Sequence, residues 1–137
     1  MHWELSFENQ SSPLIQAIDD AVAFVEQNGA SSQALYHVRF ALEEMGTNIL
    51  KYGYDDTQKH QIVFSVDLAP DVVTLHLVDD GHEFDPTQSA TPDTTLPLEQ
   101  RTPGGLGLML VRKLARHLGY ERRDEKNITT VLITRWK

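Results

Sequence analysis

The chain has 137 residues, 40% of them hydrophobic and 23% charged, which is enough apolar material for one folded domain spanning 1–137. Twelve Lys and Arg against 20 Asp and Glu give a net charge of −8, which argues against direct nucleic-acid binding. Cysteine is absent, so disulfides, cysteine nucleophiles and cysteine zinc sites are excluded. No apolar run reaches the ~20 residues of a membrane span and the N-terminus does not resemble a signal peptide, so we expect a cytoplasmic protein without membrane contact.

The first half of the chain predicts one strand, two helices and a hairpin. Apolar residues alternate over 3–7, as in a strand. A helix is expected to follow, capped by Ser12 with proline in its first turn, and to stop at Gly29. A second helix is expected from residue 31 or 32 to about residue 52. Alternating apolar residues on both sides of an Ala-Pro-Asp turn predict a hairpin within 62–77.

The second half predicts a long functional loop, a helix and a closing hairpin. Residues 80–103 lack apolar periodicity and are rich in proline and threonine, so we expect a lid over about 80–107. Helical spacing from Leu108 to Leu118 predicts a third helix, stopped by Gly119. Two strands around a turn at Lys126-Asn127 complete the order β-α-α-β-β-lid-α-β-β. This order predicts an α+β two-layer sandwich with a mixed, mostly antiparallel sheet and helices on one face.

A carboxylate and an amide lie one turn apart on the second predicted helix. Glu44 and Asn48 are four residues apart, at the rim of the apolar stripe, so both could point into one pocket. Solvated polar pairs at this spacing are also routine in helices. The spacing alone therefore leaves both interpretations open.

Asp79 and Gly81 follow the third predicted strand. A carboxylate at a strand end can accept a hydrogen bond from an exocyclic amine such as that of adenine. Gly81 would let the backbone approach a flat ring closely. A plain Asp-Gly turn has the same sequence, so this motif is also ambiguous by itself.

A glycine run, Gly104-Gly105-Leu106-Gly107, precedes the third predicted helix. Such a run leaves backbone N–H groups free to face an anion at the helix N-terminus. The pattern is neither a P-loop nor a dinucleotide fingerprint, because the lysine and the third glycine of those motifs are missing. A flexible hinge would look the same.

Together the three motifs are far more specific than each alone. Glu44-x-x-x-Asn48, Asp79-x-Gly81 and Gly105-x-Gly107, in this order, resemble the GHKL ATPases with the Bergerat ATP-binding fold. The longer stretches resemble the stand-alone anti-sigma factor/serine-protein kinases within that group; these stretches are Leu42 to Asn48 with Tyr52-Gly53-Tyr54, Val78 to Gly81 with Phe84-Asp85-Pro86, and Gly104 to Leu108 with Leu110-Val111.

The resemblance assigns roles at the adenine end of an ATP site. Asp79 is similar to the residue that reads adenine, and Gly81 to the glycine beside the ring. Thr130 resembles a strand hydroxyl that supports adenine recognition through Asp79.

The resemblance also assigns roles at the phosphate end. Asn48 is similar to the asparagine that holds Mg²⁺, and Glu44 to the candidate base for a serine hydroxyl of a protein substrate. Lys51 looks like a basic residue near the phosphates. Gly105 and Gly107 resemble the glycines that cradle the phosphates.

The implied function is that of an ATP- and Mg²⁺-dependent kinase for a serine of a small antagonist protein of STAS type. The resemblance further implies binding of a sigma factor or another regulator, and raises the option of a homodimer formed through the first strand. A non-catalytic ATP-binding switch of the same fold is the alternative.

Several residues depart from the family pattern. Glu83 stands where relatives often carry glycine, Tyr52 replaces a frequent histidine, and Ile128 replaces a glycine before the Thr-Thr pair. Glu83 and Ile128 are the reasons to keep the non-catalytic alternative open. Arg101, within the lid, could reach a terminal phosphate or remain solvated.

Overall fold

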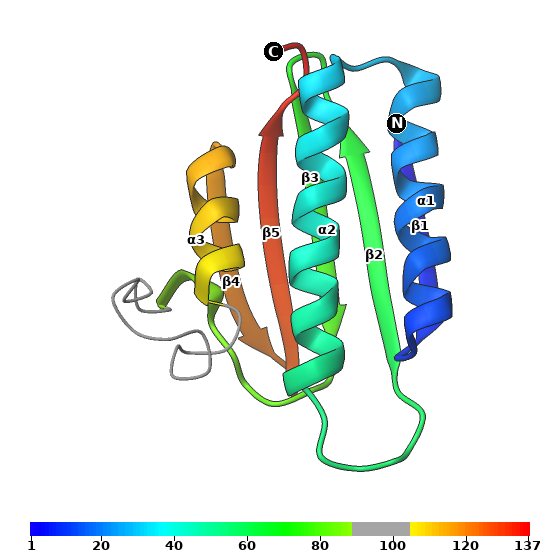
Figure 1. Ribbon diagram of the computed structural model, residues 1–137, viewed down its shortest axis with the longest axis vertical. Coiled ribbons are helices and arrows are strands. Elements are labelled where there is room, and N and C mark those ends of the chain that lie inside the picture. The colour runs from blue at the N-terminus through cyan, green and yellow to red at the C-terminus, as the bar shows by residue number, and fades with distance from the viewer. Residues whose placement is uncertain (89–104) are drawn as a thin grey trace.

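The computed structural model, which describes residues 1–88 and 105–137, has one layer of helices and one layer of strands (Figure 1). In chain order the elements are β1 His2–Glu8, α1 Ser11–Asn28, α2 Ser32–Tyr52, β2 Gln61–Leu68, β3 Val72–Asp79, the short 3-10 helix η1 Pro86–Gln88, α3 Gly105–Leu114, β4 His117–Arg123 and β5 Lys126–Thr134. The predicted α+β sandwich is therefore confirmed. No described helix combines the length and hydropathy needed to cross a membrane.

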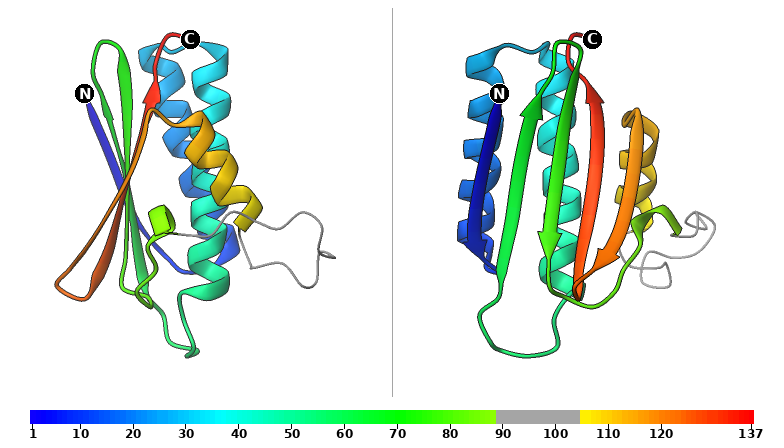
Figure 2. Two further views of the ribbon diagram at one scale, coloured as in Figure 1. Left: turned by 90° about the vertical axis from the view of Figure 1, so that its left-hand side faces the viewer. Right: turned by 180° about the vertical axis from the view of Figure 1, so that it is seen from behind.

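The five strands of the described residues form one sheet in the order β1-β2-β3-β5-β4, and each of its four ladders is antiparallel, so the sheet is not mixed as predicted. The α-helices of the described residues, α1, α2 and α3, all cover the same face of this sheet (Figure 2). Alternate residues of each strand therefore face either the helices or the opposite side. On β3 the helix-facing residues are Val73, Leu75, Leu77 and Asp79, all buried.

The two long helices bury the apolar stripes that the spacing predicted. α1 buries Leu14 and Ile18, and α2 buries Val38, Leu42 and Met45. The helices pack closely at Gly46, where an added Cβ would lie 2.7 Å from Leu14 Cδ1. Close packing at Gly46 therefore holds α2 against its neighbours, along the wall where the candidate site lies.

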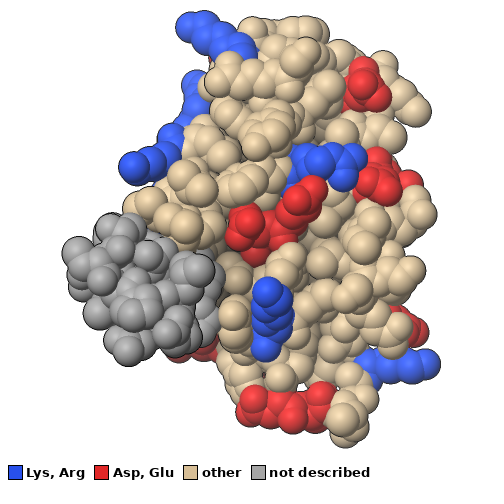
Figure 3. Space-filling model, viewed as in Figure 1, with Lys and Arg blue, Asp and Glu red and all other residues tan. Residues whose placement is uncertain are grey.

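On the helical face, basic and acidic side chains are interspersed (Figure 3), and Arg39 of α2 pairs with Asp19 of α1 at 3.0 Å.

The start of α1 differs from the prediction, whereas that of α2 agrees with it. α1 begins at Ser11 with Gln10 as its N-cap, so Ser12 is not the cap. Pro13 still lies in the first turn, where its missing N–H removes no helical bond. α2 is capped by Ser31, whose side chain accepts from the Ala34 N–H at 3.0 Å.

The third helix is shorter than predicted. It ends at Leu114, and Leu118 and Gly119 belong to β4, where they pair with Val131 and Thr130. The prediction failed because Leu118 fits a helical spacing from Leu114 and also a strand alternation with Tyr120. Pairing with β5 decided in favour of the strand.

The closing turn also differs from the prediction. Asp124 and Glu125 turn the chain with positive φ of 54° and 62°, and Arg123 pairs with Lys126 across them. Two positive φ values match the twist of a tight hairpin. Asn127 consequently lies within β5 rather than in the turn.

The beginning of the predicted lid has defined structure. Asp85 accepts hydrogen bonds from the N–H and hydroxyl of Thr87, at 2.8 and 2.6 Å, and η1 follows from Pro86. This Asx-type turn stabilises a segment that apolar periodicity could not detect. The predicted lid over 80–107 also overlaps the start of α3 at Gly105.

Candidate functional site

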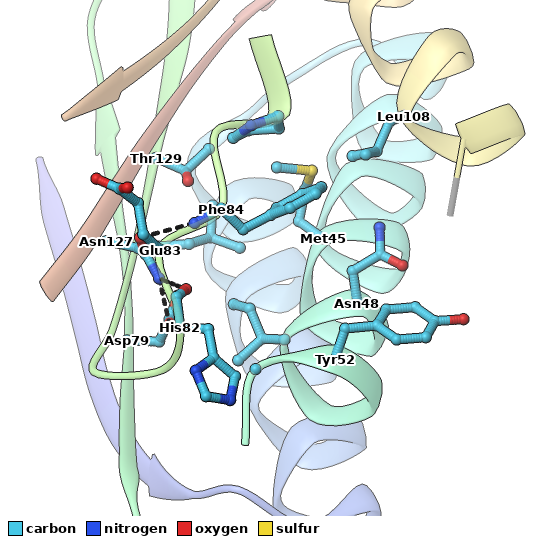
Figure 4. Close-up of a pocket in the computed structure, with 14 residues that line it drawn as sticks. Met45, Asn48, Tyr52, Asp79, His82, Glu83, Phe84, Leu108, Asn127 and Thr129 are labelled. Atoms are coloured by element: carbon cyan, nitrogen blue, oxygen red, sulfur yellow. Dashed lines mark hydrogen bonds between the residues drawn. The ribbon is translucent and has the colours of Figure 1, made fainter. Parts of the chain in front are cut away.

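A cavity of about 260 Å³ opens between α2 and the sheet, and Figure 4 shows the side chains that line it. Its wall combines apolar side chains with a few polar groups, as in many small-ligand sites. The lining residues are Met45, Asn48, Ile49, Tyr52 and Gly53 of α2 and its C-cap, Leu77 and Asp79 of β3, His82, Glu83, Phe84 and Pro86 after β3, Leu108 of α3, and Asn127 and Thr129 of β5.

Asp79 provides an acceptor at the β3 end of the cavity. Only 5% of the residue is exposed, and its Oδ1 accepts from the Gly81 N–H at 2.9 Å and from Asn127 Nδ2 at 3.0 Å. No described residue donates to Oδ2, so one oxygen is left for a ligand. Burial raises the pKa of Asp79, and the hydrogen bonds from Asn127 and Gly81 counteract part of that rise.

Gly81 packs directly against the C-terminal end of α2. A Cβ at this position would lie 2.7 Å from the carbonyl oxygen of Gly53, which also accepts from the His82 N–H at 2.8 Å. The glycine is thus required by close backbone approach. The contact holds the Asp79 turn at a fixed distance from α2 and so sets the width of the cavity.

Asn127 was missed by the sequence interpretation, which placed it in a turn. Its amide joins Asp79, His82 and Phe84 through hydrogen bonds that Figure 4 displays. Counting back in steps of two from the buried Val131 would have placed residues 129 and 127 on the cavity face.

Thr130 lies on the other face of the sheet. It pairs with His76, whereas the helix-facing positions of β5 pair with Leu77 and Asp79. The prediction that its hydroxyl supports Asp79 is therefore wrong. Thr129 contributes a hydroxyl to the cavity instead.

Asn48 projects into the cavity from α2. Its Nδ2 is buried and has no hydrogen-bond partner, although a buried amide normally has one. The donor set of the wall suits the polyphosphate and Mg²⁺ that the resemblance implies, because an amide offers a hard oxygen to a cation and an N–H to a phosphate. No group of three His, Asp or Glu among the described residues could hold a metal. A cation would therefore need ligand oxygens in addition to Asn48.

Glu44 does not line the cavity but contacts the first turn of α3. A Cβ added to Gly107 would overlap Glu44 Oε2, so the carboxylate packs directly against this glycine. Gly105 is the first residue of α3, whose free N–H groups favour anions. One turn of α2 separates Glu44 from Asn48, so the acid lies beside the part of the cavity that Asn48 and Leu108 of α3 line.

The structure does not place the two remaining predicted site residues, Lys51 and Arg101, in the cavity, for different reasons. Lys51 is exposed in the last turn of α2 and does not line the cavity. Arg101 lies outside the described residues, as does Gly104. The structure thus brings Asn48 and Asp79 together in one cavity, with Gly81 and the Glu44–Gly107 contact beside it.

A histidine braces the loop that connects α2 to β2. His60 contacts Asp56 at 2.9 Å and Asp80 at 3.2 Å, and its ring stacks on Tyr54 at 4.3 Å. Hydrogen bonds with Asp56 and Asp80 raise the pKa of His60, and the histidine lowers the pKa of Asp56. Asp80 directly follows Asp79, so this brace lies next to the cavity without lining it.

We expect this brace to stabilise the fold at weakly acidic pH. A raised histidine pKa contributes stability below its unfolded value of 6.5, and that contribution is lost as the pH rises through the folded value. Urea unfolding of His60→Gln should therefore depend less on pH between about 5 and 8 than that of the wild type. His37→Gln is the matched control, because no acidic partner contacts His37 among the described residues. Equal pH dependence in His60→Gln and wild type would contradict the prediction.

Two comparisons with known proteins bear on this site. A family model described as a histidine kinase-like ATPase domain matches residues 7–133. The serine/threonine-protein kinase BtrW of Bordetella bronchiseptica is 30% identical over 116 residues, which is 82% of this chain and 82% of that protein. The matched range includes all residues that line the cavity.

Proposed function

The chain belongs to the histidine kinase-like ATPase family, as its motifs indicated, and from this premise we propose that it is a protein serine kinase that uses ATP and Mg²⁺. Its substrate would be a small antagonist protein of STAS type, and its regulatory partner a sigma factor or another regulator. The observation that carries the proposal is the arrangement along α2. Asn48 shares a cavity with Asp79, and Glu44 lies one turn away against Gly107.

Asp79 accounts for the selection of adenine as the nucleobase. Its free oxygen accepts a hydrogen bond from the exocyclic amine of adenine, while Met45, Leu77 and Leu108 supply apolar contacts for the ring. An ionised acceptor in a buried site gives a stronger hydrogen bond than a neutral one.

Asn48 and the N-terminus of α3 would bind the phosphate chain of ATP and its metal ion. Asn48 would hold Mg²⁺ through its side-chain oxygen, and the metal, when bound, neutralises phosphate charge. The N–H groups around Gly105 and Gly107 orient the phosphate chain by backbone hydrogen bonding.

Glu44 is the candidate general base. Its carboxylate accepts the proton of the attacking serine hydroxyl as the oxygen–phosphorus bond forms, and ADP leaves with the electrons of the broken bond. In such transfers most of the catalysis comes from positioning and from compensation of charge.

The direct test is phosphoryl transfer from γ-labelled ATP to purified STAS-domain proteins of the source organism. We expect label on a serine of one of them, identified by mass spectrometry. ATP binding without transfer to any of these proteins would favour the non-catalytic switch.

The non-catalytic alternative rests on one residue. Glu83 lines the cavity and adds a negative charge near an anionic ligand. Ile128, the other departure, pairs with Val78 on the face of the sheet away from the cavity, so it gives the alternative no support.

We expect Asn48→Leu to stabilise the ligand-free protein and to abolish the effect of Mg²⁺ on ATP affinity. The buried Nδ2 has no partner, so removing it should raise the free energy of unfolding by about 1 kcal/mol. Urea unfolding measures the first effect. Calorimetric titration with ATP, in Mg²⁺ and in EDTA, measures the second. A stable variant that still gains affinity from Mg²⁺ would remove Asn48 from the metal site.

A further inference from the structure

We propose that Asn127 is a positioning residue that sets the preference for adenine over 6-oxo purines by fixing the carboxylate of Asp79. The inference rests on the proposed function only in taking Asp79 as the contact for the base. It concerns nucleotide selection and needs no kinase activity.

The amide of Asn127 can adopt only one orientation. Its Nδ2 donates to Asp79 Oδ1 at 3.0 Å and to the His82 carbonyl at 2.8 Å. Its Oδ1 accepts from the Tyr120 hydroxyl at 2.5 Å, from Arg122 Nη1 at 3.1 Å and from the Phe84 N–H at 3.4 Å. A flipped amide would turn its NH₂ group toward these donors, so the N–H must face Asp79.

The fixed amide determines which oxygen of Asp79 meets the ligand. Asn127 and the Gly81 N–H both donate to Oδ1, so Oδ2 remains as an acceptor. An acceptor binds the 6-amino group of adenine and repels the 6-oxo group of inosine or guanine. Asn127 is 4% exposed, so water cannot easily replace its hydrogen bond.

The charge of Asp79 depends on several groups around it. Burial is the largest cause of its raised pKa. Asp80, the residue after β3, adds to the rise and Arg122 of β4 opposes it, while Tyr54, after α2, faces it as a neutral phenol whose own pKa is raised mainly by burial. His82 and Glu83 lie along the same cavity. In the wild type, ATP affinity should therefore fall as the pH drops through the raised pKa of Asp79.

Two variants of Asn127 separate positioning from a merely structural role. Asn127→Leu lacks the donor, so ATP affinity should fall about tenfold to a hundredfold while ITP affinity changes little. Asn127→Asp places two carboxylates side by side, which share one proton at lower pH. That proton replaces the amide hydrogen, so ATP affinity of this variant should rise as the pH falls from about 8 to about 5.5.

Calorimetric titration with ATP and ITP over this pH range, with circular dichroism to verify folding, provides the test. Thr130→Val, on the opposite face of β5, is the matched control and should leave both affinities unchanged. Equal losses for ATP and ITP in Asn127→Leu, or an ATP affinity of Asn127→Asp that does not rise as the pH falls, would overturn the inference. If Asn127→Leu does not fold, the pH trend of Asn127→Asp decides alone. A wild type that binds ATP but lacks kinase activity would contradict the proposed function and leave this inference standing.

Discussion

Replacing Asp79 by asparagine is expected to weaken ATP binding about a hundredfold to ten-thousandfold, which would be the largest binding effect of any single substitution at this site. In the wild type, two donors converge on Oδ1, one from Gly81 and one from Asn127. The new amide must direct its oxygen to those donors, so its NH₂ group faces the ligand. A donor would then meet the amino group of adenine, which is also a donor.

The magnitude follows from two losses. A hydrogen bond to a charged group contributes about 1.5–3 kcal/mol, and a buried donor without a partner costs about 1–3 kcal/mol. Their sum of about 2.5–6 kcal/mol corresponds to a factor of about 10² to 10⁴ in the dissociation constant, at about 1.4 kcal/mol for each factor of ten.

The fold should survive Asp79→Asn. Burial disfavours the ionised carboxylate, as the raised pKa of Asp79 shows, and asparagine keeps the hydrogen bonds without the charge. Calorimetric titration with ATP and ITP measures the expected loss and a relative shift toward ITP. Asp80→Asn is the matched control, because Asp80 is exposed and contacts His60 rather than the cavity. Unchanged ATP affinity in Asp79→Asn would remove Asp79 from the base site.

Much of the fold could be predicted because long segments repeat one period. The stripe of α2 from Val38 through Leu42 to Met45 has no competing interpretation, and neither has the alternation of β3. Leu118 fits two periods, and only its pairing with Val131 on β5 decides between them. Such pairing joins segments whose register the local sequence does not specify.

The same physical reason explains which parts of the site were found. Asp79 and Gly81 carry a local signal, and so do Glu44 and Asn48, because each pair lies within one element or turn. Asn127 acts through partners on β3 and β4, so its role depends on register. Asparagine also favours turns, and this preference directed the prediction to the wrong side of the hairpin.

Glu44→Gln is expected to reduce phosphoryl transfer to the protein substrate by about a hundredfold to ten-thousandfold, the range of general base catalysis. Glutamine keeps the size of the side chain and its contact with Gly107 but cannot accept the serine proton. ATP affinity should stay within about threefold of the wild type, because Glu44 does not line the cavity. Label transfer from γ-labelled ATP measures the first quantity, and calorimetric titration the second.

Glu43→Gln is the matched control, since it makes the same chemical change one residue earlier. Glu43 is exposed and contacts Arg39 at 3.9 Å on the outer side of α2, so its loss should leave transfer unchanged. Equal losses of phosphoryl transfer in both variants would indicate that transfer depends on the total charge of α2 and not on the position of Glu44. Full activity in Glu44→Gln would move the proton acceptor to another residue or to the substrate. A base that acts only in the transition state lowers turnover and leaves binding intact. If Glu44→Gln lost both ATP affinity and phosphoryl transfer, Glu44 would therefore be a residue of the phosphate site.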